Sequence, residues 1–477
     1  MRKKGSVTVF LTLILSLLLS LICASIESVR MASARTQILN GMDIGLYSLF
    51  GQYDKELLTD YDLFALDGSR GGGQLDLAAV CDELEAYMNP VLKQNSQKLT
   101  LCQSGLTGYR LLTDQKGEAF YQQIVGYMQE TLGSQGIQLL LGRMSERQEK
   151  TAQADQSANQ AQSKGSIDRY DSEMNQASEK SQQAAEEAQV VPQAPPAKNP
   201  ITIMKRIMKR GVLELVLPGG NGLSTKEIEK GTLVSGRGLQ QGMEMPDGMT
   251  VENSYTSEVL FQQYLMEHLG SYAEPSSTGL AYQVEYIFGG KDSDEDNLKA
   301  VASKLLFIRE GVNFACLMAD NVKRSEAQAL ATAIASGFLV PPAAVIIEAA
   351  LILCWAFAES VLDVRELFAG GRIPLVKSSG DWQISLENLP DLMEGLDSMR
   401  RNDEQGMSYK DYLQVLVLTV SKEKKVMRAM DMIENTIREK GRKNFCMDSC
   451  IVALEAFADV KANKKKDFQV IRQYCYE

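Results

Sequence analysis

The 477-residue sequence contains a single histidine, His268. One imidazole is too few for a histidine-based metal site, and a Ser-His-Asp triad would depend on this one side chain. His268 lies just before Gly270 in a stretch with helical spacing, where a histidine commonly ends a helix. The sequence also lacks a Walker A motif and a nucleophile-elbow serine. We therefore expect no enzymatic activity, no cofactor and no metal site.

Positive charge and cysteine are scarce as well. The chain has 50 Lys and Arg residues against 61 Asp and Glu residues, which gives a net charge of −11. A nucleic-acid partner is therefore not expected, because binding phosphates needs a basic face. Eight cysteines are too few for a disulfide scaffold. The hydrophobic share of 44% is ordinary for folded domains, and the length allows roughly three of them at most.

A long apolar run stands close to the N-terminus. Three basic residues at positions 2–4 precede an uncharged stretch from Gly5 to Ile26, and Glu27 is the first acid. About twenty apolar residues in a helix span the hydrocarbon core of a bilayer. The basic cluster should stay in the cytoplasm, which places the rest of the chain outside the cell membrane. The alternative is a cleaved signal peptide, although its apolar core is normally only about 7–15 residues long.

The helical pattern continues beyond this run. No proline occurs between Glu27 and Tyr53, and apolar residues recur there with a period near 3.6. This predicts one long helix, embedded in the membrane at one end and packed on a folded domain at the other. That arrangement is the architecture of pilins.

The motif Lys3-Lys4-Gly5-Ser6-Val7-Thr8-Val9-Phe10-Leu11, the apolar run and then Glu27-Ser28-Val29-Arg30 resemble the N-terminus of TadE/TadG-like proteins. These belong to the tight-adherence (Flp) pilus system. Segments 358–365, 374–377, 381–382 and 409–413, with the Cys-containing C-terminal hairpin, resemble a clostridial membrane-protein family of unknown function that begins with the same anchor. The resemblance implies a Gram-positive cell surface and a role near pilus assembly.

The same resemblance raises the question of processing. Prepilins are cut after a glycine, and the fifth residue of the mature chain is usually glutamate. Cleavage after Gly5 would make Ser6 the first residue and Phe10 the fifth. Gly5 and Ser6 are thus a candidate processing site, and an ordinary juxtamembrane glycine is the alternative. The missing glutamate favours an anchored assembly factor over a major pilin, since TadG-like members also lack it.

The middle of the chain changes composition. Residues 143–189 are rich in Gln, Ala, Ser, Glu and Lys, and small residues recur there at spacings of three and four on both sides of Gly165. This pattern predicts a helical hairpin or coiled coil with a small-residue seam, and a solvated linker is the alternative. Four prolines then make residues 190–200 an extended break.

Local patterns predict further elements. Residues 75–93 have helical spacing, and residues 98–112, 213–217 and 281–288 have the composition of strands. A second apolar stretch, 337–357, contains Glu348, so we expect a buried core helix there instead of a second crossing. A C-terminal hairpin turns at 462–465 and carries Cys450 and Cys475, which form a conceivable disulfide.

Together these features predict a mostly helical α+β fold with a long anchored N-terminal helix and a C-terminal β-hairpin. The expected function is a membrane-anchored, outward-facing structural or assembly component of a Tad/Flp-like pilus or surface secretion apparatus. Its partners would be the lipid bilayer and other proteins of that apparatus. A carboxylate-based cell-wall hydrolase and a ligand-binding ectodomain are the alternatives. The predicted regions are a basic stub (1–5), a transmembrane helix (6–26), a pilin-like region (27–142), the helical hairpin or linker (143–189), the break (190–200) and a C-terminal α+β domain (201–477).

Overall fold

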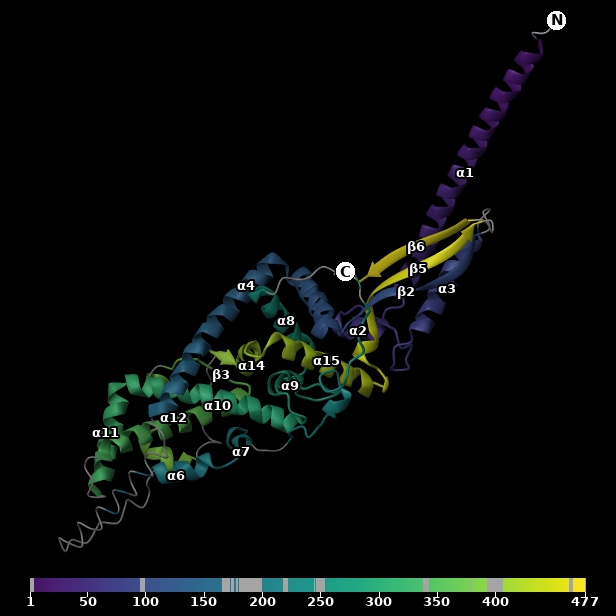
Figure 1. Cartoon of the computed structure of the whole chain (residues 1–477). Coiled ribbons are helices and arrows are strands. Elements are labelled where there is room, and N and C mark those ends of the chain that lie inside the picture. Colours follow the sequence, from purple (N-terminus) through teal and green to yellow (C-terminus); the bar gives the residue numbers. More distant parts are fainter. Residues whose placement is uncertain are drawn as a thin grey trace. The chain divides into compact units, whose positions relative to one another are not determined.

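The structure is a computed structural model of the whole chain (Figure 1). It describes residues 4–94, 99–164, 200–217, 222–243, 254–337, 343–377, 379–392, 406–462 and 466–476, with the single residues 172, 176, 179 and 245 between them. The chain forms two compact units. Unit 1 comprises residues 1–127, 231–252 and 437–477, and unit 2 comprises residues 128–230 and 253–436. The unit boundaries fall inside helices α4 (Asp114–Lys164) and α15 (Lys422–Glu439).

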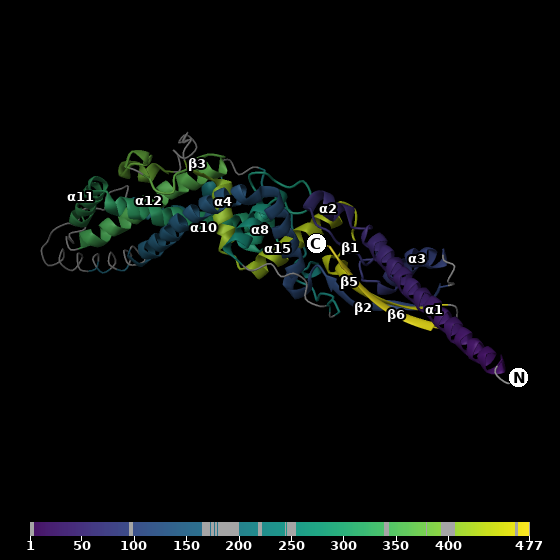
Figure 2. The same cartoon turned by 90° about the horizontal axis from the view of Figure 1, so that it is seen from above.

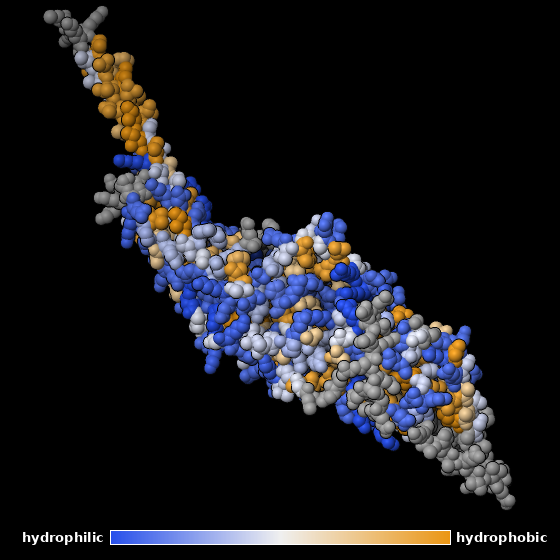
Figure 3. Space-filling model, turned by 180° about the vertical axis from the view of Figure 1, so that it is seen from behind, coloured by the Kyte–Doolittle hydropathy of each residue, from blue (hydrophilic) through white to orange (hydrophobic). Residues whose placement is uncertain are grey.

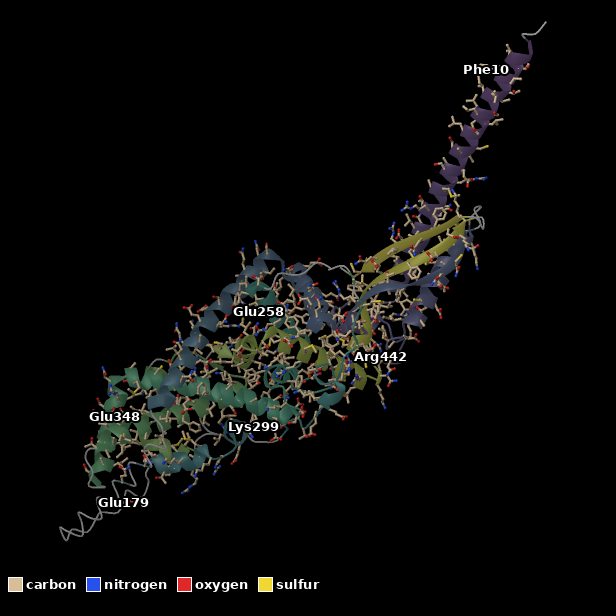
Figure 4. All side chains as sticks on the ribbon, in the orientation of Figure 1. Phe10, Glu179, Glu258, Lys299, Glu348 and Arg442 are labelled. Carbon is tan, nitrogen blue, oxygen red and sulfur yellow. The ribbon has the colours of Figure 1, made fainter. Side chains whose placement is uncertain are left out.

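Helix α1 (Lys4–Phe50) opens unit 1 and has two different halves. Large apolar side chains from Val7 to Ile26 are 41% to 67% exposed, and they project without neighbours around Phe10 (Figure 4). This half appears as an apolar shaft in Figure 3. In the second half, buried residues recur every three or four positions and give one apolar stripe: Ala34, Ile38, Met42, Leu46 and Leu49.

The stripe packs on an antiparallel sheet and on helix α3 (Leu77–Lys93). Strand β5 (Cys450–Ala462) lies at the centre and pairs with β1 (Leu66–Asp67), β2 (Leu99–Leu111) and β6 (Lys466–Cys475). Along β5, Leu454, Ala456, Ala458 and Val460 are fully buried, because alternate side chains of a strand point to the same face. Figures 1 and 2 show α1 and α3 side by side on one face of this sheet. Helix α2 (Lys55–Tyr61) and the 3-10 turn η5 (Met447–Ser449) complete the regular elements assigned to unit 1.

Unit 2 is built around helix α12 (Ala344–Phe368). Helices α10 (Asp294–Ala319), α11 (Asn321–Gly337), α6 (Pro200–Met208) and α7 (Val212–Val216) pack against it. The unit also contains α8 (Tyr255–His268), α9 (Gln283–Gly289), α14 (Tyr409–Leu418) and the short pair β3 (Arg372–Ile373) and β4 (Met407–Ser408). The 3-10 turns η3 (Ser379–Asp381) and η4 (Leu386–Asp391) also belong to unit 2. A further 3-10 turn, η1 (Lys230–Thr232), contains the boundary between unit 2 and unit 1.

The predicted α+β class, mostly helical, is confirmed, as are the long N-terminal helix and the C-terminal hairpin. Strand β2 and helix α3 match the predictions for 98–112 and 75–93. Two predicted strands are wrong: 213–217 lies in helix α7 except for its last residue, and 281–288 lies largely in helix α9. Both are short, mostly apolar segments, which periodicity alone cannot assign to a buried strand or a buried helical turn.

The arrangement of the C-terminal region also differs from the sequence prediction. Residues 201–477 were expected to form one domain, whereas 231–252 and 437–477 belong to unit 1. The reason is the pairing of β5 with β2, which joins strands from opposite ends of the sequence, such as Leu99 with Ala462. Such long-range pairing leaves no mark on local composition.

The first arm of the predicted hairpin is helical, as the final part of α4. Its small residues Ala154 and Ala158 are buried, and Ala158 lies against Gly311 of α10. The small-residue seam therefore packs within unit 2. Most of the second arm, and the break at 190–200 up to Pro200, lie outside the described residues.

Candidate functional site

The exposed half of α1 is the first functional feature. It begins a helix that is long and apolar enough to cross a membrane, and none of its most apolar window is buried. About twenty residues at 1.5 Å each give the roughly 30 Å of a hydrocarbon core. The hydroxyls of Thr12, Ser16 and Ser20 donate to backbone carbonyls one turn earlier, at 2.8–2.9 Å. These polar groups are therefore satisfied inside the helix, as a lipid environment requires.

The candidate processing residues lie at the start of this helix. The backbone of Gly5 and Ser6 belongs to the first turns of α1, and their side chains are outside the described part. The predicted cleavage between them stays a prediction.

Helix α1 packs closely against α3 and the sheet of unit 1. A Cβ atom on Gly45 would lie 2.7 Å from Cγ of Met88, and one on Gly41 would lie 3.3 Å from Cδ2 of Leu92. Both glycines thus allow α3 to approach the α1 backbone closely, and a side chain at position 45 would require Met88 to shift. On the sheet side, the Arg472 guanidinium of β6 donates to the Asp43 carboxylate at 2.9 Å. Residues 41–46 are therefore held between α3 and the sheet.

The two cysteines of the predicted disulfide lie apart in this sheet. Cys450 is buried, Cys475 is exposed, and both are free thiols. The register pairs Cys475 with Ala453, three residues along β5 from Cys450. Three residues of a strand cover about 10 Å, whereas bridged cysteines need Cα atoms within about 7 Å. The bridge is therefore not formed in this structure.

Unit 2 contains a buried ionic network. Nζ of Lys377 contacts Glu359 and Asp363, both at 2.5 Å, and Asp363 also contacts Nη2 of Arg309 at 2.8 Å. The four side chains are at most 2% exposed. Burial alone would raise the pKa of Asp363, but the Lys377 ammonium and the Arg309 guanidinium hold that pKa below its ordinary value.

The network fixes the segment that follows β3. Arg309 donates to the carbonyls of Pro374 and Leu375 at 3.0 and 2.9 Å. Glu359 accepts from the backbone N–H of Ile384 at 3.0 Å, and the Trp355 indole donates to the carbonyl of Ile384 at 2.7 Å. Both carboxylates are paired with cations and buried from solvent. The network therefore has a structural role: it holds the segment after β3 in place.

Glu285 is a further buried carboxylate of unit 2, outside the ionic network. It accepts from the Tyr409 hydroxyl at 2.6 Å and from the Tyr272 backbone N–H at 2.8 Å, both through Oε1. Its Oε2 atom is buried without a hydrogen-bond partner. Burial raises the pKa of Glu285 to about 7, although the two hydrogen bonds lower it. Neither this residue nor the ionic network was predicted from the sequence.

The remaining sequence predictions for chemistry can be placed in the fold. His268 ends α8, stacks on Tyr264 and lies 3.1 Å from the Tyr264 carbonyl. Among the described residues, no group of three or more His, Cys, Asp or Glu side chains is arranged to hold a metal ion. The second apolar stretch is the core helix α12, whose most apolar window is 78% buried.

Comparison with known proteins gives one result. No curated protein and no solved structure matches the chain. The model of a family of unknown function, DUF5702, matches residues 192–462. Since this match covers more than half of the sequence, the chain belongs to the DUF5702 family.

Proposed function

We propose that this protein is a single-pass membrane protein with an outward-facing C-terminal part, and that it serves as a structural or assembly component of a Tad/Flp-like pilus or surface secretion apparatus. The observation that carries the proposal is the division of α1. One continuous helix offers about twenty exposed apolar residues and then buries its next stripe against a four-stranded sheet. This is how a pilin-like protein joins its anchor to its head.

The orientation follows from charge. Basic residues 2–4 precede the apolar run, while Glu27 and Arg30 follow it, so the basic end stays in the cytoplasm. The burial of Glu359 and Asp363 supports a structural role for these two acids over a part in the hydrolase alternative. The acids of the ionic network are closed to solvent and neutralised by Lys377 and Arg309, whereas carboxylates that cleave a glycan must reach the scissile bond.

Orientation can be tested with cysteines that the chain already carries. Cys102 and Cys475 are exposed in unit 1. A membrane-impermeant maleimide should label both on intact cells, and the double variant with serine at these positions should lose that label. Labelling only after permeabilisation would contradict the outward orientation.

The assembly role needs a separate experiment. Purification of the tagged chain from native membranes should recover a secretion ATPase and membrane platform proteins. A control with residues 6–26 replaced by a cleavable signal peptide should not recover them. Cleavage of peptidoglycan by the purified chain, abolished by one Asp or Glu substitution, would overturn the structural role.

Processing can be read from the mature N-terminus of the membrane-purified protein. It should lie ahead of the apolar run, or at Ser6 if a prepilin peptidase acts. A start near Ser25 or Ile26 would identify a secreted protein and contradict the anchor.

A further inference from the structure

The outer edge of β6 presents a row of free backbone groups. Strand β6 pairs with β5 in ten unbroken antiparallel pairs, and the Tyr476 N–H extends the ladder by donating to Val452. Because hydrogen-bonded positions alternate, the even-numbered residues face β5 and the odd-numbered residues direct N–H and C=O outward. In the part of the chain that the structure describes, these outward groups have no hydrogen-bond partner. They belong to Asp467, Gln469, Ile471, Gln473 and Cys475.

This edge lacks the usual protection against strand addition. Exposed edges in natural sheets are commonly interrupted by bulges, prolines or several charges. The β5–β6 pairing has no register shift and β6 has no proline. Its charged residues are Lys466 and Asp467 at its start and Arg472, which is paired with Asp43. The other long edge strand, β2, differs, because three register shifts interrupt it and Tyr109 pairs with Met243. The contrast within one sheet singles out β6 as the edge that can accept a strand.

Exposed apolar side chains of α1 lie alongside the same edge. Asp43 contacts Arg472 at 2.9 Å, and the Tyr47 ring meets Tyr474 at 6.4 Å between centroids. In this stretch Ile44 is 48% exposed and Tyr47 is 69% exposed. A strand added to β6 would place alternate side chains toward α1, where apolar ones would cover these two residues.

The edge ends at a cavity of about 660 Å³. Its lining consists of Phe64 and the last residues of the strand region, Gln473, Tyr474, Cys475 and Tyr476. The Phe64 ring stacks on Tyr476 at 5.6 Å between centroids. The cavity therefore offers aromatic faces to a large apolar side chain of a segment that pairs with β6.

We propose that the β6 edge binds an extended segment of another protein, with apolar side chains at alternate positions and one large apolar side chain in this cavity. Main-chain hydrogen bonds would supply affinity and the cavity would supply selectivity. The inference deepens the assembly role and rests on it for the identity of the natural partner.

A second anchored copy does not fit this edge. Helix α1 runs parallel to β6, since Asp43 lies at Arg472 and Phe50 lies at Tyr474 and Tyr476. Two β6 strands related by a twofold axis would be antiparallel. Their α1 helices would then point in opposite directions, and the two anchors could not enter one membrane from the same side.

The test uses the full-length chain in detergent micelles and a displayed library of random ten-residue peptides. Gln469→Pro removes an outward N–H that does not take part in the β5 ladder, and Gln469→Thr keeps it. Selected peptides should alternate apolar residues, bind the natural chain and the threonine variant alike, and bind the proline variant at least about tenfold more weakly. Hydrogen exchange with bound peptide should protect the amides of residues 469, 471 and 473.

A further variant covers the case in which Gln469→Pro does not fold. Tyr47→Glu changes an exposed side chain outside the core, and it should weaken the same peptides about tenfold. Selection of peptides that bind all variants equally, or protection of β2 amides instead, would overturn the proposal. Concentration-dependent protection of the β6 amides without peptide would identify a second copy and overturn it too. Because no membrane is needed, a failure here is distinguishable from a failure of the cysteine-labelling experiment.

Discussion

Replacing Glu285 with glutamine should make unit 2 more stable at alkaline pH. Burial raises the pKa of this carboxyl from its ordinary 4.5 to about 7, so the folded state holds the proton more tightly than the unfolded state. The contribution of Glu285 to the unfolding free energy is therefore largest below about pH 4.5, falls as the pH rises toward about 7, and stays lower above that. The amide of glutamine carries no charge and still offers an oxygen to Tyr409 and Tyr272.

The size of the effect follows from the shift. A difference of one pKa unit corresponds to about 1.4 kcal/mol, so a rise from 4.5 to about 7 sets an upper limit of about 3 kcal/mol for the gain at pH 8. Near pH 4.5 the gain should vanish. Glu387→Gln is the matched control, because Glu387 is an exposed glutamate of the same unit.

Denaturant unfolding followed by tryptophan fluorescence is the suitable assay. Trp355 and Trp382 are the two tryptophans of the chain, and both lie in unit 2. The natural protein should lose stability between pH 5 and 8, while Glu285→Gln should show a flatter profile than both the natural protein and the control. Equal profiles for the three proteins would refute the conclusion that a buried, protonated Glu285 governs this pH dependence.

Three further substitutions test the packing. Lys377→Met removes a cation that neutralises two buried carboxylates, so we expect a loss of about 3–5 kcal/mol in the tryptophan-detected transition. Gly45→Leu places a side chain where α3 contacts α1, and it should cost about 1–3 kcal/mol, measured as faster hydrogen exchange in residues 77–93. Ala158→Leu overpacks the contact with Gly311 and should lower the melting temperature of unit 2, while Asn159→Leu, at the exposed neighbouring position, should leave it nearly unchanged.

The elements that the sequence predicted well have long local patterns. The continuous apolar run and the 3.6-residue spacing that follows it are sufficient to predict α1, and alternation with a clear turn predicts the β5–β6 hairpin. The segments 213–217 and 281–288 were assigned wrongly because mostly apolar segments of five and eight residues satisfy a buried strand and a buried helix equally well. In both cases packing inside unit 2, not local propensity, decides the conformation.

The buried charges could not be found from spacing alone. Arg309 and Lys377 come from segments 54 and 14 residues away from Asp363, and only the fold brings the three groups together. One local signal does exist. Glu359 and Asp363 are four residues apart in an otherwise apolar stretch, which places both on one face of a helix that has little access to water. Two acids in that setting require buried cations, and Lys377 and Arg309 supply them.

The close contacts of α1 bear on how an anchored head could transmit force. The glycines at positions 41 and 45 let α3 lie against one side of the helix, and the Asp43–Arg472 ion pair ties the other side to β6. A pull on the exposed apolar half of α1 would therefore load the α1–α3 contact and the β5–β6 ladder together. Ten pairs of the ladder lie parallel to α1, so the load acts as shear along many hydrogen bonds at once instead of opening them one by one. A component that holds an assembly to a membrane benefits from this geometry, and a head joined by a flexible linker would lack it.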